Sequence, residues 1–216
     1  MALQKKDFIE IEFTARIKGG EIFDSNIKED IENKELKEIA KPFVFCLGEG
    51  MFLPAVDDFL IGKEIGEYEI ELSPEQSFGK RNADLIQMMP SNIFSEQKIN
   101  PIPGRMFNFD GRLGKILTVT GGRVMVDFNN PVAGKDVVYK IKILRKIEDI
   151  NEKIKALNEF FFRRELKSEI KEGKLILEAE KPMKPFVELF KDKFKEMLGL
   201  ELEVKEIEGN NSKQSQ

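Results

Sequence analysis

The stretch that decides the fold is Gly20-Glu21-Ile22-Phe23-Asp24-Ser25, together with Asn129-Asn130-Pro131-Val132-Ala133-Gly134-Lys135 much later in the chain. The first stretch follows the strand pattern of Phe8 to Ile17 and a Gly19-Gly20 turn, and it sets an aromatic ring beside a carboxylate. The second is a tight turn that leads back into a strand pattern from Asp136 to Leu144. Between them the chain makes a long excursion, which predicts one domain interrupted by another.

Composition bounds the class of protein. The chain has 216 residues, long enough for about two or three small domains. Charged residues make up 34% and apolar residues 41%, and Ile, Lys and Glu dominate. This mixture is typical of a protein from a heat-loving organism, and equally of an ordinary well-solvated surface.

Several function classes are excluded or disfavoured by residue content. The net charge is −4 without a basic block, so neither nucleic acid nor an anionic membrane is an expected partner. There is no histidine, which rules out Ser-His-Asp and Cys-His nucleophiles and imidazole-ligated zinc. No calcium loop, Walker loop or dinucleotide fingerprint is present, so we predict no metal and no cofactor.

The remaining global signals concern compartment. Cys46 is the only cysteine and lies in an apolar strand pattern, which favours a small buried hydrophobe over a reactive thiol. No signal peptide opens the sequence, and no apolar run approaches about 20 residues. We therefore expect a soluble, cytoplasmic protein.

The interrupted domain should be mostly β-structure with one short helix. Strand patterns cover 42–47, 67–72 and 137–144 in addition to the first strand. Pro54 at a helix start, acidic residues in the first turn and Gly62 after the last turn predict a helix between them. Residues 27–41 are charged and polar, which indicates a long surface loop with at most one helical turn.

A second composition begins past Gly79. Glycine-marked turns separate short apolar runs, and Ile116–Val119 with Arg123–Phe128 predicts a hairpin across Gly121-Gly122. We assign residues 1–83 and 131–147 to the interrupted domain and 84–130 to a small inserted β domain.

The C-terminal part predicts a third unit. Asp149 and Glu152 form a capping box before a helix from Ile150 to Arg163. A hairpin should follow around Glu172-Gly173, then one helix from Pro185 to a Gly199 cap, with Leu189 and Phe190 on its apolar face, and a last strand over 200–207. Residues 148–208 thus read α-β-β-α-β, and 209–216 are a polar tail that we expect to be disordered.

These motifs together resemble the FKBP-type peptidyl-prolyl cis-trans isomerases. The resemblance rests on a series of short motifs in the right order, namely Phe13-Thr14, Gly20-x-x-Phe23-Asp24-Ser25, Pro42-Phe43-x-Phe45-x-Leu47-Gly48-x-Gly50, Gly62-Lys63-x-x-Gly66-Glu67, Ser73-Pro74-Glu75-x-x-Phe78-Gly79 and Asp127-x-Asn129-x-Pro131-x-Ala133-Gly134. More narrowly, the chain is similar to the long archaeal members and to the bacterial SlyD group, which carry a chaperone domain in the flap. The C-terminal module is similar to the extra domain of the long archaeal forms.

The resemblance implies an α+β fold, in which an antiparallel β-sheet wraps a short helix, with the inserted β domain and the C-terminal α-β-β-α-β module added. It also implies an aromatic cleft. The residues in catalytic positions are Asp24, Phe23, Phe43, Leu53, Phe78 and Tyr139, and those lining the cleft are Phe13, Phe52 and Val56.

The chemistry of proline isomerisation suits such a cleft. Rotation about an X-Pro bond costs about 18–20 kcal/mol because resonance gives the bond double-bond character. No bond is made or broken, so a dry aromatic site that favours the twisted amide is sufficient. A backbone N–H near Leu53 and the carboxylate of Asp24 are the expected polar groups, although Asp24 also fits the cap of a turn.

The inserted segment suggests client binding. Its methionines and aromatic residues predict an exposed apolar groove for unfolded polypeptides, formed by Met88, Met89, Ile93, Phe94, Met106, Phe107 and Phe109. The alternative is that these residues are simply the core of the inserted domain.

The expected function is an isomerase and folding chaperone that acts on unfolded or partly folded polypeptides. Val56 stands where many family members have tryptophan, and Phe13 and Phe78 stand in place of tyrosines. These departures leave open a pure holdase-type chaperone with a weak or inactive cleft. The C-terminal module is expected to support a homodimer or a second client surface, unless its apolar helix face is only its own core.

Overall fold

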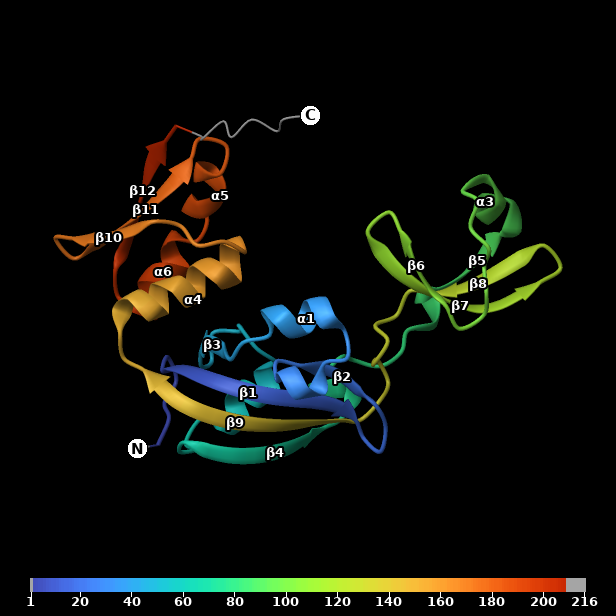
Figure 1. Ribbon diagram of the computed structural model, residues 1–216, viewed down its shortest axis with the longest axis horizontal. Helices are drawn as coiled ribbons and strands as arrows, with labels where there is room; N and C mark the ends of the chain where they lie inside the picture. Colours follow the sequence, from blue (N-terminus) through green and yellow to red (C-terminus); the bar gives the residue numbers. More distant parts are fainter. Residues whose placement is uncertain (1, 209–216) are drawn as a thin grey trace. The chain divides into compact units, whose positions relative to one another are not determined.

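The computed structural model describes residues 2–208, which divide into two compact units (Figure 1). The first unit contains the chain up to residue 15, residues 22–70 and the chain from residue 139 onwards. The second contains residues 16–21 and 71–138. The tail for which we expect disorder, 209–216, lies outside the described residues.

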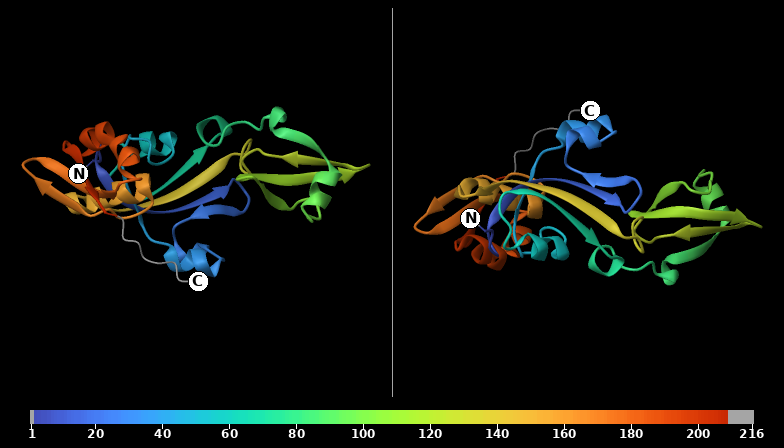
Figure 2. Two further views of the ribbon diagram at one scale, coloured as in Figure 1. Left: turned by 90° about the horizontal axis from the view of Figure 1, so that it is seen from above. Right: turned by 90° about the horizontal axis from the view of Figure 1, so that it is seen from below.

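A five-stranded sheet organises the first unit. The strand order is β2-β1-β9-β4, and β3 pairs with β1 in antiparallel register, with Phe8 opposite Cys46 and Ile11 opposite Phe43. The long strands β1 and β9 run side by side in both Figure 1 and Figure 2. The elements of this part are β1 (Phe8–Ile17), β2 (Ile22–Ser25), η1 (Lys28–Asp30), α1 (Lys34–Ile39), β3 (Phe43–Cys46), α2 (Pro54–Leu60), β4 (Gly66–Leu72) and β9 (Val137–Ile147).

The local sequence explains these elements. Pro54 opens α2, and Gly62 follows its end with a φ of +84°, a backbone conformation that favours glycine. The helix buries Val56 and Leu60 completely. Residues 27–41, expected to form a loop with at most one helical turn, contain both η1 and α1, because Asn33 caps α1 by accepting hydrogen bonds from the N–H groups of Glu35 and Leu36.

The C-terminal part of the first unit has its own small sheet. Its order is β10-β11-β12, with β10 and β11 antiparallel and β11 and β12 parallel. The helix expected after the capping box is α4, whose first turn is capped by the carboxylate of Asp149. The elements are α4 (Ile150–Phe162), β10 (Ser168–Lys171), β11 (Lys174–Glu180), α5 (Lys184–Glu188), α6 (Lys191–Leu198) and β12 (Glu201–Ile207).

The prediction of one helix from Pro185 to Gly199 is wrong. The chain forms α5 and α6 instead, separated at Phe190, whose φ of −97° and ψ of 7° are not helical. The Phe190 ring packs on that of Phe161, with ring centroids 4.6 Å apart. Leu189, by contrast, is 77% exposed. The break therefore turns Leu189 away from the face on which periodicity placed it.

The second unit holds a four-stranded antiparallel sheet of order β5-β8-β7-β6. The expected hairpin is β7 and β8, with a register irregularity between Ile116 and Thr118. Gly114 is required on β7, because a Cβ there would lie 2.7 Å from Val126 Cγ1. The elements are η2 (Pro74–Gln76), η3 (Ala83–Leu85), β5 (Ile86–Pro90), α3 (Ser91–Glu96), β6 (Met106–Phe109), β7 (Arg112–Thr120) and β8 (Arg123–Asp127).

The fold is α+β in character, with antiparallel sheets and a few helices, as expected from the sequence. Within residues 2–208, no helix has the length and apolar content needed to cross a membrane.

Candidate functional site

Aromatic rings of the first unit gather around Phe52. Its ring centroid lies 5.1 Å from that of Phe13, 5.8 Å from Tyr139 and 5.9 Å from Phe43. Phe23 joins through Tyr139, edge to face, at 6.2 Å. We call these five residues (Phe13, Phe23, Phe43, Phe52 and Tyr139) the aromatic cluster. All five were expected from the sequence to line the site, and they come from β1, β2, β3, β9 and the turn before α2.

Burial divides the aromatic cluster into a floor and a rim. Phe13 and Tyr139 are 6% and 3% exposed, so they form the floor. Phe23, Phe43 and Phe52 are half-buried and keep part of their rings at the surface. Phe45, whose facing the sequence left open, is fully buried and stacks on Phe43 at 5.3 Å. Val56, in α2, is also fully buried.

Asp24 is the carboxylate beside the aromatic cluster. It lies exposed on β2 next to the half-buried Phe23. Crowding by protein atoms raises the pKa of the Asp24 carboxyl, and the backbone N–H of Ser25 opposes that rise. Its exposed surface limits the size of this effect. Burial raises the pKa of the Tyr139 phenol, and the negative charge of Asp24 adds to the rise, so the two side chains feel each other electrostatically.

The turn after Asp24 is fixed to β1 by side-chain hydrogen bonds. Asn26 Oδ1 accepts from Phe13 N–H at 2.7 Å, and Asn26 Nδ2 donates to the Ile11 carbonyl at 2.9 Å. Ser25 Oγ donates to the Phe13 carbonyl or the Asp30 carboxylate, each at 2.9 Å. Thr14 Oγ1 also contacts Asp30. These bonds set the position of Phe23 and Asp24.

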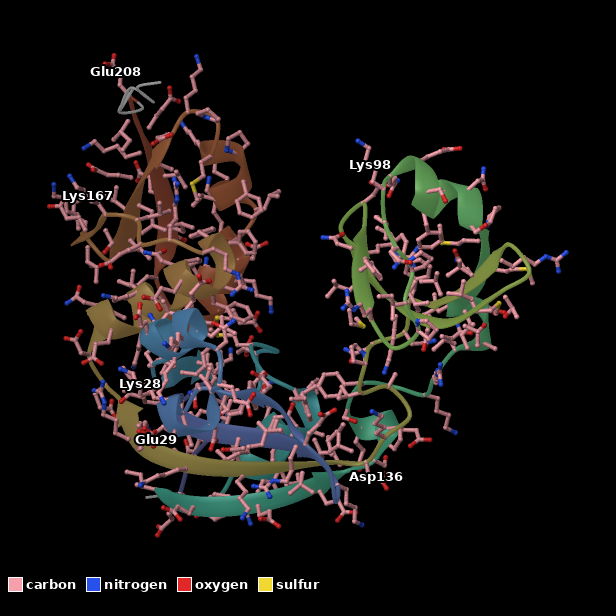
Figure 3. All side chains as sticks on the ribbon, turned by 45° about the vertical axis from the view of Figure 1, so that its right-hand side comes forward. Lys28, Glu29, Lys98, Asp136, Lys167 and Glu208 are labelled. Atoms are coloured by element: carbon pink, nitrogen blue, oxygen red, sulfur yellow. The ribbon has the colours of Figure 1, made fainter. Side chains whose placement is uncertain are left out.

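Sequence reasoning missed this bracing. The available signal was the polar run Asp24-Ser25-Asn26 directly after a strand, because short polar side chains bond to neighbouring backbone at turns. Figure 3 labels Lys28 and Glu29 in η1, the short helix that follows Asn26 in the chain and ends at Asp30.

Leu53 offers a free hydrogen-bond donor at the site. It is the N-cap residue of α2, and its carbonyl accepts from the N–H groups of Val56 and Asp57. Its own N–H donates to no protein acceptor among residues 2–208. The N–H therefore stands available beside Phe52, as a substrate carbonyl would require.

The comparisons with known proteins give the family of this arrangement. A family model described as "FKBP-type peptidyl-prolyl cis-trans isomerase" matches residues 1–100, which contain β1, β2, β3 and α2. The matched part of the chain, residues 1–100, is a domain of the FKBP-type peptidyl-prolyl cis-trans isomerases. A second model, described as "FKBP26, IF domain", matches residues 87–132 of this FKBP-type isomerase.

The relatives agree with this assignment. The short-type peptidyl-prolyl cis-trans isomerase of Methanocaldococcus jannaschii is 28% identical over 145 residues, 65% of this chain and 92% of the relative. The FKBP-type 16 kDa isomerase of Escherichia coli (strain K12) is 27% identical over 149 residues, 66% and 93% of the two chains. The SlyD isomerase of Helicobacter pylori (strain J99) is 26% identical over 151 residues, 68% and 76%.

One expected cleft residue of this FKBP-type isomerase, Phe78, lies in the second unit. Phe78 follows η2 and is half-buried. Its part in the cleft stays a prediction.

The inserted segment sorts its apolar residues onto two faces of the β5–β8 sheet. Phe94, Ile116, Val124 and Val126 form the core, and Met89, Ile93, Ile99, Phe107, Phe109 and Phe128 pack against it. Phe94 is 1% exposed, so the expectation that it lies in an exposed groove is wrong. For Phe94 the alternative interpretation of the sequence holds: it belongs to the core of the inserted segment, because α3 packs its ring onto the sheet.

The opposite face of the same sheet carries exposed apolar side chains among polar ones. Met88 pairs with Met125 across β5 and β8. Asn108 pairs with Leu113 across β6 and β7, and Met106, two residues before Asn108, lies on the same face. Met88, Met106 and Leu113 are 57%, 41% and 59% exposed. We call Met88, Met106, Leu113 and Met125 the open face. Sequence reasoning found its two outer methionines and missed Leu113 and Met125, although strand alternation carried the signal.

Two other kinds of chemistry, a reactive thiol and a metal site, have little support in this FKBP-type isomerase. Burial, first, and the charges of Glu49 and Asp57 raise the pKa of the Cys46 thiol to about 12, so it stays protonated at neutral pH. Among residues 2–208 no group of three or more His, Cys, Asp or Glu side chains is arranged to hold a metal ion.

Proposed function

We propose that the aromatic cluster, with Phe78, Leu53, Val56 and Asp24, is the catalytic cleft in which the X-Pro bond of an unfolded polypeptide rotates. The observation that carries this proposal is the meeting of five rings from distant parts of the chain beside one free N–H and one carboxylate. Half-buried Phe23, Phe43 and Phe52 supply an apolar surface for the proline ring.

The catalytic effect follows from the electronic change at the peptide bond. A twisted amide has lost resonance, so its carbonyl is less polar than that of the planar ground state. An apolar surface that excludes water disfavours the planar form and accepts the twisted one. About 4 kcal/mol of such differential stabilisation gives a thousandfold acceleration, without nucleophile or general acid.

The two polar groups have separate roles in this proposal. The Leu53 N–H donates to the carbonyl next to the rotating bond and holds the peptide in place. The Asp24 carboxylate, fixed by the bonds of Ser25 and Asn26, orients the twisted peptide from the other side of the turn.

Replacing the carboxylate tests its role. We expect Asp24→Ala to lower kcat/KM for a fluorogenic X-Pro tetrapeptide by about five- to tenfold, the cost of one solvent-exposed hydrogen bond of about 1–1.4 kcal/mol. The same loss should appear in the proline-limited refolding of a protein. Glu21→Ala, at an exposed carboxylate in the preceding turn, is the control. A catalytically silent wild type that still suppresses aggregation would favour the alternative, a pure holdase with an inactive cleft.

The second part of the proposal concerns client capture. We assign residues 84–130 as an inserted chaperone domain between 1–83 and 131–147, and residues 148–208 as a C-terminal module. The open face (Met88, Met106, Leu113 and Met125) offers flexible apolar side chains that adapt to varied sequences. Binding there raises the effective concentration of prolines at the cleft. Met89, Ile93, Phe107 and Phe109 pack against the core but are only partly buried, and their exposed parts add to the client-binding surface.

A double substitution separates capture from catalysis. We expect Met88→Ser with Leu113→Ser to slow catalysed refolding of a whole protein by about tenfold, because two exposed apolar contacts of about 0.7 kcal/mol each are lost. Tetrapeptide isomerisation should not change. Ile170→Ser, at a residue of β10 that is 40% exposed, is the matched control. Unchanged refolding in the double variant would refute capture by the open face.

A homodimer through the C-terminal module remains part of the proposal. Phe186 and Leu189 are 44% and 77% exposed there and would supply its apolar contact.

A further inference from the structure

A groove separates strand β3 from helix α4 within the first unit. Its volume is about 400 Å³, inside the range of sites that take small ligands or a few side chains. One wall contains Pro42, Phe43 and Val44, and the other contains Ala156, Phe160 and Arg163. Helix α4 packs beside β3, so the C-terminal module supplies half of the groove (Figure 1).

The β3 wall exposes unused backbone groups. Leu47 N–H donates to the Asp7 carbonyl at 2.9 Å, just beyond the paired residues of β1 and β3. Hydrogen-bonded and non-bonded pairs alternate in an antiparallel ladder, so Phe45 and Phe43 bond to β1 while Val44 points its N–H and C=O the other way. No other strand among residues 2–208 pairs with β3. The Val44 N–H and C=O therefore point away from β1 at a residue that lines the groove, where a partner with a backbone of its own can pair with them.

The charged side chains that line the groove, taken with their ion-pair partners, are neutral in sum, but Arg163 stands without an ion pair among residues 2–208. Glu159 binds Lys41 at 2.5 Å, and Glu10 and Glu152 each bind Arg145 at 2.6 Å. Lys155 lies 3.2 Å from Glu165. Arg163 is exposed at the C-terminal end of α4 and has no ion pair among residues 2–208. A ligand with an acidic group complements this arrangement.

The groove shares a wall with the aromatic cluster. Phe43 lines the groove and also packs on Phe52, at 5.9 Å. Val44, the next residue of β3, lines the groove as well, so Phe43 is the residue that the two sites share.

We propose that this groove is a second subsite for the substrate, which binds the extended client segment flanking the target proline and prefers an acidic residue there. The inference rests on the proposed catalytic cleft. The client backbone pairs with the N–H and C=O of Val44, its apolar side chains contact Phe43 and Phe160, and its carboxylate pairs with Arg163. The C-terminal module thus contributes to substrate selection.

The test compares short and long peptides around one X-Pro bond. A tetrapeptide fills only the cleft, whereas nonapeptides with Glu or Lys placed before or after the proline also reach the groove. We expect kcat/KM for a Glu nonapeptide to exceed that for the tetrapeptide and to fall about fivefold in Arg163→Glu, which removes an ion pair of surface strength. In the same Arg163→Glu variant, kcat/KM for the Lys nonapeptide should rise, and kcat/KM for the tetrapeptide should not change.

Arg164→Glu is the matched control, because Arg164 is the exposed neighbour and does not line the groove. N-methylation of the nonapeptide backbone outside the tetrapeptide should remove the length advantage, and the Val44 amide should shift in NMR spectra only with the unmethylated peptide. The proposal would be overturned if Arg163→Glu and Arg164→Glu changed kcat/KM for the nonapeptides equally, or if the nonapeptides had no higher kcat/KM than the tetrapeptide. It would also be overturned if the protein dimerised with rising concentration in a way that covers the groove. A wild type inactive on the tetrapeptide would instead refute the cleft.

Discussion

Phe23→Ala should lower kcat/KM for a fluorogenic X-Pro tetrapeptide by about 30- to 100-fold, the largest catalytic loss expected in this chain. Phe23 is half-buried and packs edge to face on Tyr139 at 6.2 Å, so its truncation opens the apolar wall to water. Water in the cleft stabilises the polar planar amide and removes the preference for the twisted one.

Phe23 is a better test than the floor of the aromatic cluster. Truncation of Phe13 or Tyr139, at 6% and 3% exposure, would cost about 3–5 kcal/mol of folding stability and confuse the result. Ile22→Ala, at the neighbouring residue of β2 with 42% exposure, is the control. A loss below about threefold in folded Phe23→Ala protein, judged against the tenfold per 1.36 kcal/mol relation, would contradict the cleft.

The second large effect concerns stability and pH. Asp57 lies in α2 at 2% exposure, and Gly48 N–H donates to its Oδ2 at 3.1 Å, while its Oδ1 has no hydrogen-bond partner within residues 2–208. Burial, with smaller contributions from Asp58 and Glu49, raises the pKa of its carboxyl from 3.8 to about 6. The folded state therefore binds the Asp57 proton more tightly than the unfolded state does.

The direction of the pH effect follows from linkage. The favourable contribution is complete below pH 3.8 and is lost as the pH rises through about 6, where the buried carboxyl must ionise. A rise of this size corresponds to about 3 kcal/mol of unfolding free energy. We expect Asp57→Asn, measured by urea unfolding between about pH 4 and 8, to gain about 3 kcal/mol relative to wild type across that interval.

Asp58→Asn, at the exposed neighbouring residue, should keep the pH dependence of the wild type. Parallel curves for wild type and Asp57→Asn would contradict the prediction. The turn that Asp57 holds, Gly48 to Gly50, leads into Phe52 and Leu53, so the same variant reports whether this carboxyl also positions the cleft.

Some features followed from local sequence alone. Pro54 and Gly62 marked α2, Asp149 and Glu152 marked α4, and alternation marked β1, β4 and β9. Strand β5 and helix α3 were missed, because the segment 84–97 is short and mixed and takes its structure from pairing with β8 and from the burial of Phe94. The periodicity after Pro185 failed because the backbone leaves the helical conformation at Phe190, where its ring packs on Phe161, and side-chain spacing does not record such a break.

The sequence by itself determined the kinds of residue available: aromatic rings and one carboxylate at motif spacing, no histidine, and apolar residues in an inserted segment. Tertiary structure alone decided which rings meet, which methionines face solvent, and that Asn26, Leu53 and Val44 present their polar groups as they do. The physical reason is that periodicity records the alternation along one strand or helix, whereas contact and burial depend on the partner elements, which lie far away in the chain.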